Sequence, residues 1–443
     1  MRAGFLGALI RAAGLLIAFA VQMLLARLIG DAASYGLYAW GQNLLFLLGA
    51  VFALGIPLAS ARFVAVHDHR GDTAAASEVV GASLRWLLLT STVGIAAGFA
   101  VVAVLPLSAF SDIPRSVVLL AIVAAPLVSL IVLLQSHARA RAQLLLAFAP
   151  NQALRPLLTG LLAGAFAFWA GRQLQTMEVL LLLCGSLLLV ALLQTIIARR
   201  LNARRQHTLL SAAPLAEAGS YAPSQLMHNA LPLFGTRLAD MVMKYGNIVL
   251  LGILGGPVVA AGFFVADRLA RLGAIPGTVV AAVIQPWLAS AHAEGERHAL
   301  QAVVTEASHV SLWPTLTACL ALYLLGPLLL SLFGHDFKSA ITVLNILLLV
   351  HVAAATLGPC QQILVMSGQQ HALMRLLALA AVVHVCALFL LIPLYGATGA
   401  ALATLASTSL ARSGCLILVR KRMGLQPSAL VHLIKRLRTR ELK

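Results

Sequence analysis

The chain has 443 residues, of which 61% are hydrophobic and 10% are charged, and its formal net charge is +17. Because a soluble domain carries roughly 25% charged residues, this composition excludes a water-facing globular protein and predicts that lipid solvates most of the exterior. The basic residues collect between apolar runs and at the C-terminus. This distribution is typical of membrane topology, so we expect no nucleic-acid partner.

Apolar runs long enough to cross a bilayer, about 20 residues each, follow one another along the chain. The first half contains six of them, at 8–29, 37–60, 82–105, 117–136, 153–170 and 178–198. The second half contains six more, at 230–254, 261–287, 308–332, 340–360, 373–394 and 397–419. The first run begins like a cleavable signal peptide, but it continues to Ile29, so we expect a retained helix. The predicted fold class is an all-α polytopic membrane protein of about twelve transmembrane helices.

The basic residues of the connecting segments predict the orientation, because cytoplasmic loops carry the excess of Lys and Arg. With the N-terminus inside, the cytoplasmic segments hold Arg2, Arg62, Arg70, Arg139, Arg141, Arg199, Arg200, Arg204, Arg205, Arg297 and the basic tail. The outer loops hold only Arg27, Arg115, Arg172 and Lys338. We therefore expect both termini to be cytoplasmic.

Two weakly similar segments divide the chain into halves. Residues 25–38 resemble residues 251–264 without gaps, with two leucines and two glycines in register, and six predicted spans separate the copies. The halves then share one orientation, which is a transporter architecture with the substrate site between the repeats. Chance similarity between apolar helices is the alternative. The predicted domains are a six-helix lobe at 1–205, a cytoplasmic linker at 206–229, a second six-helix lobe at 230–420 and a basic tail at 421–443, which is either an interfacial amphipathic helix or frayed.

The seventh span carries a polar stripe. Arg237, Asp240, Lys244 and Asn247 recur at spacings of three and four, so they share one helical face. A charge at mid-membrane costs about 2.5–3.5 kcal/mol, so this face must meet protein or water. The repeat register of 226 places Arg237 opposite Arg11, which predicts two arginines at pseudo-symmetric positions of a central cavity.

Arginine suits phosphate because its planar fork binds two oxygens at once. The alternative is that ion pairs around Asp240 only stabilise the seventh helix. Asp240 is also a candidate proton or sodium site, and coupling to either ion stays open. Weaker candidates for the cavity are Arg62, Arg155, Arg268, Arg271 and Arg412. The cysteines form no CxxC motif or Cys/His cluster, so we expect no metal site and no other cofactor.

Three segments carry a resemblance to a known family. Residues 26–39 (ARLIGDAASYGLYA), 332–340 (LFGHDFKSA) and 392–404 (IPLYGATGAALAT) are similar to motifs of bacterial polysaccharide-biosynthesis flippases. These belong to the multidrug/oligosaccharidyl-lipid/polysaccharide (MOP) exporter superfamily, to which the multidrug MATE transporters also belong. The resemblance implies two six-helix lobes around a central cavity, alternating access, and residence in the bacterial inner membrane. The implied substrate is an oligosaccharide linked through diphosphate to undecaprenol.

In that family, basic cavity residues hold the diphosphate and acidic sugars, a role that Arg11, Arg237 and Lys244 match. Where the family often has Asp this chain has Asn247, and its acid lies at Asp240. The implied partners are the lipid-linked substrate and membrane lipids, with polysaccharide-assembly enzymes as candidates, and we expect the protein to act as a monomer.

Three functions can be weighed against these features. A lipid-linked oligosaccharide flippase fits the basic stripe best. A cation-coupled multidrug exporter of the same superfamily is the alternative, but it is expected to have an acidic cavity. A membrane polysaccharide polymerase or ligase would need large outer loops with catalytic groups, and the outer loops here are short. We therefore expect a transporter and not an enzyme.

Overall fold

The computed structural model describes residues 2–104, 112–209, 223–280, 284, 297–367 and 369–427. Within these ranges every regular element is helical, as the composition predicts. The first half comprises α1 (Arg2–Ile29), α2 (Ala32–Phe52), α3 (Ile56–His69), α4 (Thr73–Val104), α5 (Arg115–Ala140), α6 (Leu144–Ala149), the π-helix η2 (Pro150–Leu154), α7 (Arg155–Ala170) and α8 (Thr176–Leu209). The second half comprises α9 (Pro223–Leu254), α10 (Pro257–Gly273), α12 (Arg297–Phe333), the 3-10 helix η3 (His335–Ala340), α13 (Ile341–Thr356), α14 (Cys360–Met366) and α15 (Gln370–Met423).

The helices account for the predicted spans. Among the described residues, 8 helices are long and apolar enough to cross a membrane, or 9 if α2 and α3, bent by 52°, form one span. The long α15 covers both the eleventh and twelfth predicted spans, which divide at Gly396, where the backbone leaves the helical conformation. α9 coincides with the seventh predicted span and α10 with the start of the eighth. The chain is therefore an all-α, multi-pass membrane protein, as predicted.

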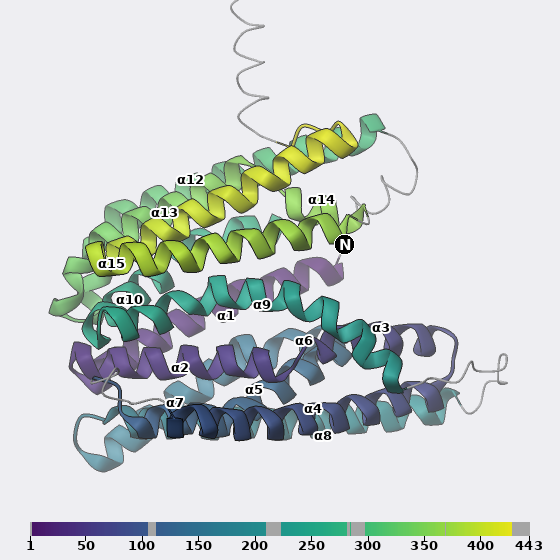
Figure 1. Cartoon of the computed structure of the whole chain (residues 1–443), viewed down its shortest axis with the longest axis horizontal. Coiled ribbons are helices and arrows are strands. Elements are labelled where there is room, and N and C mark those ends of the chain that lie inside the picture. Colours follow the sequence, from purple (N-terminus) through teal and green to yellow (C-terminus); the bar gives the residue numbers. More distant parts are fainter. Residues whose placement is uncertain are drawn as a thin grey trace, which may run out of the picture.

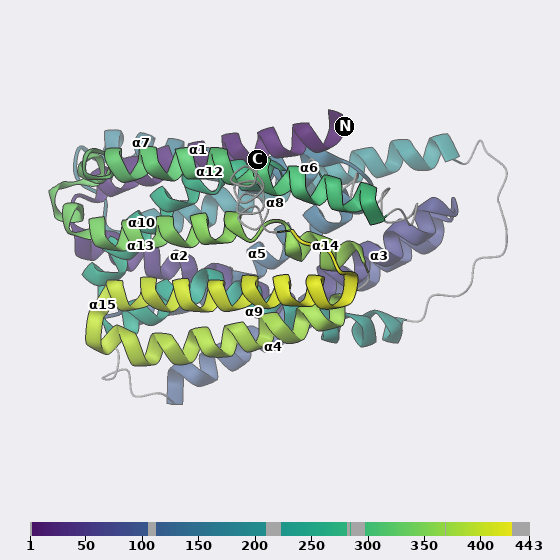
Figure 2. The same ribbon diagram turned by 90° about the horizontal axis from the view of Figure 1, so that it is seen from above.

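The long helices lie side by side along one common direction (Figures 1 and 2). The second-half helices α12, α13 and α15 form one side of the bundle, the first-half helices α2, α4 and α8 form the other, and α9 runs between them (Figure 1). The two sides diverge toward the end at which the N-terminus lies, here called the N-terminal end (Figure 1). Leucines such as Leu88, Leu324 and Leu390 are more than 60% exposed on the outside, which suits a lipid-facing surface.

Glycine turns recur at the register of the predicted internal repeat. Gly30 precedes α2 with φ of 89°, and Gly256 precedes α10 with φ of 84°, at the predicted register of 226. Gly171 ends α7 with a φ of 62°. The register of 226 places its counterpart at residue 397, and the neighbouring Gly396 has a φ of 55°. A positive φ is costly for residues with a Cβ, so each half uses glycine for the same turns.

The halves pack closely near the Gly30 and Gly256 turns, at the end of the bundle opposite the N-terminal end. A Cβ added to Gly36 on α2 would lie 1.9 Å from the carbonyl oxygen of Pro257, so the two backbones touch there. The indole nitrogen of Trp40 donates a hydrogen bond to the Val249 carbonyl at 2.9 Å. Arg27 at the end of α1 donates to the Leu332 carbonyl at 2.7 Å. This end of the interface between the halves is closed.

At the N-terminal end, α1 packs instead within its own half. A Cβ on Gly7 would contact Phe148 of α6, and one on Gly14 would lie 2.7 Å from the Gln152 carbonyl oxygen. The halves approach each other here through α3 and α9, where a Cβ on Gly55 would lie 2.3 Å from the Ala230 carbonyl oxygen. The predicted linker and tail lie largely outside the described residues, but α8 extends to Leu209 and α9 starts at Pro223.

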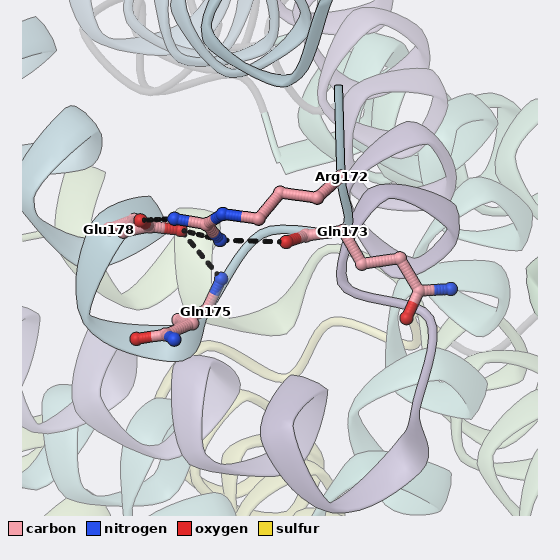
Figure 3. A network of polar contacts seen from close by, with 4 residues as sticks. All are labelled: Arg172, Gln173, Gln175 and Glu178. Carbon is pink, nitrogen blue, oxygen red and sulfur yellow. Dashed lines mark hydrogen bonds and ion pairs between the residues drawn. The ribbon is translucent and has the colours of Figure 1, made fainter. Parts of the chain in front are cut away.

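A network of polar contacts stabilises the turn between α7 and α8 (Figure 3). Arg172 and Glu178 form an ion pair at 2.5 Å, and Glu178 also accepts a hydrogen bond from the backbone nitrogen of Gln175 at 2.8 Å. The hydrogen bond from Arg172 to Glu178 raises the pKa of the guanidinium above its ordinary value. Glu178 lies in the first turn of α8, where a carboxylate offsets the unpaired amides and the helix dipole.

Candidate functional site

The predicted stripe on α9 divides into two parts. Arg237 and Asp240 form an ion pair at 3.2 Å, with 41% and 59% of their side chains exposed. Lys244 is also exposed, and its ammonium lies 5.1 Å from the centroid of the Tyr245 ring. Asn247 is buried and accepts a hydrogen bond from the Thr404 hydroxyl at 3.3 Å, which links α9 to α15. Asn247 thus stabilises packing within the second half, whereas the three charged residues stay accessible.

Arg11 and Arg237 converge on a third arginine. Arg139 near the end of α5 lies within electrostatic range of both, and it donates a hydrogen bond to Ser136 at 2.7 Å. The Arg11 guanidinium lies 4.3 Å from the centroid of Phe148, and its Nε has no hydrogen-bond partner among the described residues. We call Arg11, Arg139 and Arg237 the arginine triad. Asp240 neutralises only one of its members, so the triad retains positive charge.

A second group of cations lies deeper between the halves. Arg155 on α7 and Arg268 on α10 come from opposite halves, and Arg155 lies within electrostatic range of Arg268. The Arg155 guanidinium lies 4.8 Å from the centroid of Phe46, and that of Arg268 lies 4.4 Å from the centroid of Phe264. The two guanidinium groups repel each other, and the contact of each with an aromatic face helps to offset this repulsion.

Hydrogen bonding distinguishes the two arginines. Arg155 donates to the Asn151 side chain at 2.9 Å. The Nε of Arg268 is buried and, in the described part of the chain, has no hydrogen-bond partner. A buried donor without an acceptor is costly. Arg268 therefore has donor capacity available for a bound anion.

Arg271 and Asp267 complete this group. Arg271 donates to Asp267 at 2.7 Å, and this pair is much less exposed than the pair on α9, at 27% and 15%. Tyr245 lies within electrostatic range of Lys244, Arg268 and Arg271. We call the group the central network; its members are Arg155, Lys244, Tyr245, Asp267, Arg268 and Arg271. Among the described residues it sets four cations against the Asp267 carboxylate, and Asp240 of α9 also lies within electrostatic range of Arg271, so positive charge is in excess.

The two groups lie at different depths. At 1.5 Å per residue, Arg268 lies about 16 Å from the start of α10 and Lys244 about 15 Å from the end of α9, which is half of a 30 Å bilayer core. Arg11 and Arg237 lie about 26 Å from the ends of α1 and α9, near the opposite membrane face. Because α10 begins at Pro257 and not at residue 261, Asp267, Arg268 and Arg271 lie well inside the span and are not anchors at its outer edge.

The remaining predicted residues lie elsewhere. Arg62 is exposed on α3, and Arg412 on α15 lines a separate cavity within the second half. Sequence reasoning missed Arg139, which it counted only as a loop cation, and gave no role to Tyr245, whose aromatic ring beside Lys244 was the available signal. In the ranges that the structure describes, no three His, Cys, Asp or Glu side chains are grouped to hold a metal ion.

Comparisons with known proteins agree with this architecture. A family model described as polysaccharide biosynthesis protein matches residues 3–292. No curated protein sequence matches the chain. An inward-facing multidrug resistance MATE family transporter of the MOP superfamily is similar, with a TM-score of 0.73 and 15% identity, over 94% of this chain and 98% of that one.

Two further solved structures are similar at lower scores. The outward-facing conformation of a multidrug resistance MATE family transporter of the MOP superfamily has a TM-score of 0.61 and 15% identity, over 95% of this chain and 96% of that one. A MOP superfamily transporter from Pyrococcus furiosus, described as having a binding pocket of reverse polarity that suggests a different function, has a TM-score of 0.60 and 14% identity over the same shares. At these identities the likeness shows the fold alone.

Proposed function

The chain belongs to the polysaccharide biosynthesis protein family and has the fold of MOP-superfamily transporters, and from this premise we propose that it is a flippase for lipid-linked oligosaccharides. Its substrate is an oligosaccharide joined through diphosphate to a polyprenol, which the protein moves from the cytoplasmic to the periplasmic leaflet by alternating access. The substrate class and the direction of movement each depend on separate observations.

The central network is the observation that carries the substrate class. Four cations surround Asp267 at half the depth of the membrane, and Asp240 is a second acid within electrostatic range of Arg271. The remaining net positive charge would be costly without a compensating anion. A diphosphate supplies that anion, and it accepts the paired donors that an arginine fork presents. A site for cationic drugs requires the opposite balance of charge. The polarity therefore favours an anionic substrate over a multidrug exporter.

The contribution of both halves supports alternating access. Arg155 belongs to the first half and Arg268 to the second, so a diphosphate between them would contact both. When the halves rotate about such a site, the cavity would close toward one membrane face and open toward the other, and the anion would stay in contact with its donors. The described conformation, with its closed opposite end, suits loading from the N-terminal end.

The direction depends on orientation. By the positive-inside rule the N-terminal end is the cytoplasmic end, since the basic connecting segments lie there. The arginine triad then lies near the cytoplasmic leaflet, and the central network lies about a further 10 Å into the protein. We infer that the triad receives the diphosphate head group and that the central network holds it during translocation.

A reconstitution experiment tests this function. The purified protein is placed in proteoliposomes with a fluorescent polyprenyl-diphosphate oligosaccharide, and the label that becomes accessible to a membrane-impermeant quencher is followed over time. We expect protein-dependent flipping that is lost in Arg155→Gln/Arg268→Gln and kept in Arg375→Gln, which removes an exposed arginine from α15. The same lipid without diphosphate should not be moved. Transport of a cationic drug, with no flipping of the diphosphate lipid, would overturn the proposal in favour of a multidrug exporter.

A further inference from the structure

A second polar cavity lies entirely within the second half of the chain. Its volume is about 170 Å³, and its walls come from α12, α13, α14, α15 and the residues that follow α10. The polar side chains that line it are those of Thr278, Ser311, Thr315, His351, Gln362 and Arg412. All of its lining residues belong to the second half, and His351 in its wall lies within electrostatic range of Asp267 and Arg271 of the central network.

Arg412 brings a positive charge to this cavity without a matching negative one. Among the described residues, no carboxylate lies within 4 Å of its guanidinium. Asp267, which lies within electrostatic range of His351, is already paired with Arg271 at 2.7 Å. An unpaired cation inside a membrane protein is costly, so Arg412 calls for a partner that the described side chains do not provide.

The neighbouring polar groups also lack partners. Thr315 is only 2% exposed, and its hydroxyl makes no hydrogen bond within the described ranges. The side-chain oxygen of Gln362 is likewise buried without a partner in the part of the chain that the structure describes. Since the two ends of an amide are assigned from their contacts, Gln362 can turn its NH₂ group toward an acceptor. The lining thus offers a guanidinium, hydroxyls, an amide and an imidazole, and, in its described part, no carboxylate.

From this donor set we infer that the cavity binds a small inorganic anion, of the size of chloride or phosphate, against Arg412 and Thr315. The cavity is large enough for a small anion with some water and too small for a lipid-linked sugar. The anion neutralises Arg412 and joins α12 to α15. This site is distinct from the flippase site, and it stands even if the transported substrate is a different one.

Thermal unfolding of the purified full-length protein in detergent tests the site. Sodium gluconate, whose anion is much bulkier than chloride or phosphate, is replaced stepwise by sodium chloride or by sodium phosphate at constant ionic strength. A ligand that binds only the folded state raises the unfolding temperature by mass action. We expect a rise that saturates in one or both salts, and the salt that produces it identifies the anion.

Three variants assign the rise to this cavity. Arg412→Gln should abolish it, whereas Arg375→Gln, an exposed position on the same helix α15, should keep it. Thr315→Val keeps the shape and the charge, and should raise the half-saturating anion concentration about tenfold by removing one donor to a charged ligand. The inference is overturned if wild type shows no rise in either salt, or if Arg412→Gln retains it. Should Arg412→Gln fail to fold, an unchanged half-saturating concentration in Thr315→Val would equally overturn the inference.

Discussion

The arginine triad and the central network contain the same kinds of side chain in different surroundings. In the triad, Arg237 and its partner Asp240 are 41% and 59% exposed near one face of the membrane. In the central network, Arg271 and Asp267 are 27% and 15% exposed at half its depth. Exposed ion pairs contribute about 0.2–1 kcal/mol, whereas breaking a buried one costs about 3–5 kcal/mol. Depth, and not residue type, therefore decides which charges determine stability and binding.

Matched changes at the two aspartates test whether the deeper ion pair contributes more to stability than the exposed one. Asp267→Asn removes the partner of Arg271 deep in the span, and we expect it to lower the free energy of unfolding by about 3 kcal/mol, the lower end of the range for buried pairs. Asp240→Asn, the matched change on α9, should cost less than about 1 kcal/mol. Unfolding of both variants in the same detergent measures the difference. Equal losses would show that depth does not separate the two groups.

The closed end of the interface gives a second, somewhat smaller effect. Gly36→Ala places a Cβ 1.9 Å from the Pro257 carbonyl oxygen, so the halves must move apart. We expect a loss of about 2 kcal/mol, typical of overpacking. Gly164→Ala on α7, where nothing lies within 4 Å, is the control and should be neutral or slightly stabilising. Thermal unfolding measures both, and an unaffected Gly36 variant would mean that the halves are not packed as described.

The triad should give the smallest effect, and one that depends on salt. We expect Arg11→Gln/Arg237→Gln to slow flipping about threefold at low ionic strength, because these partly exposed arginines attract the head group through weakly screened charge. Near 1 M salt the Debye length falls to about 3 Å and the difference from wild type should disappear. Initial flipping rates across a salt series measure this. A large defect that persists in high salt would instead make the triad part of the deep site.

Much of the fold follows from the sequence because apolar length and glycine turns are local properties. The repeat register found between residues 25–38 and 251–264 reappears in the positive φ of Gly30 and Gly256. The same register predicts Arg11 and Arg237 at equivalent positions, and both lie within electrostatic range of Arg139. Local pattern was therefore sufficient for the helices, for their repeat and for part of the arginine triad.

The sequence pattern gave the arginines of the central network only as weaker cavity candidates, and there is a physical reason. Its members reside on three helices, and only tertiary packing brings Arg155 of α7 near Arg268 of α10. A local signal was available for depth, since Gly256 followed by Pro257 is a typical helix start and would have moved Arg268 inward. The aromatic faces of Phe46 and Phe264 that hold the two guanidinium groups leave no periodic trace in the sequence.

Binding of a polyprenyl diphosphate to the purified protein shows whether the central network holds the diphosphate. The dissociation constant is measured at fixed salt for wild type, for Arg155→Gln/Arg268→Gln and for Arg11→Gln/Arg237→Gln. Since hydrogen bonds to charged groups contribute about 1.5–3 kcal/mol each, we predict that the first pair of changes weakens binding at least tenfold, and the second about threefold. Unchanged affinity in Arg155→Gln/Arg268→Gln would contradict the account, because the diphosphate would then not be held by the central network.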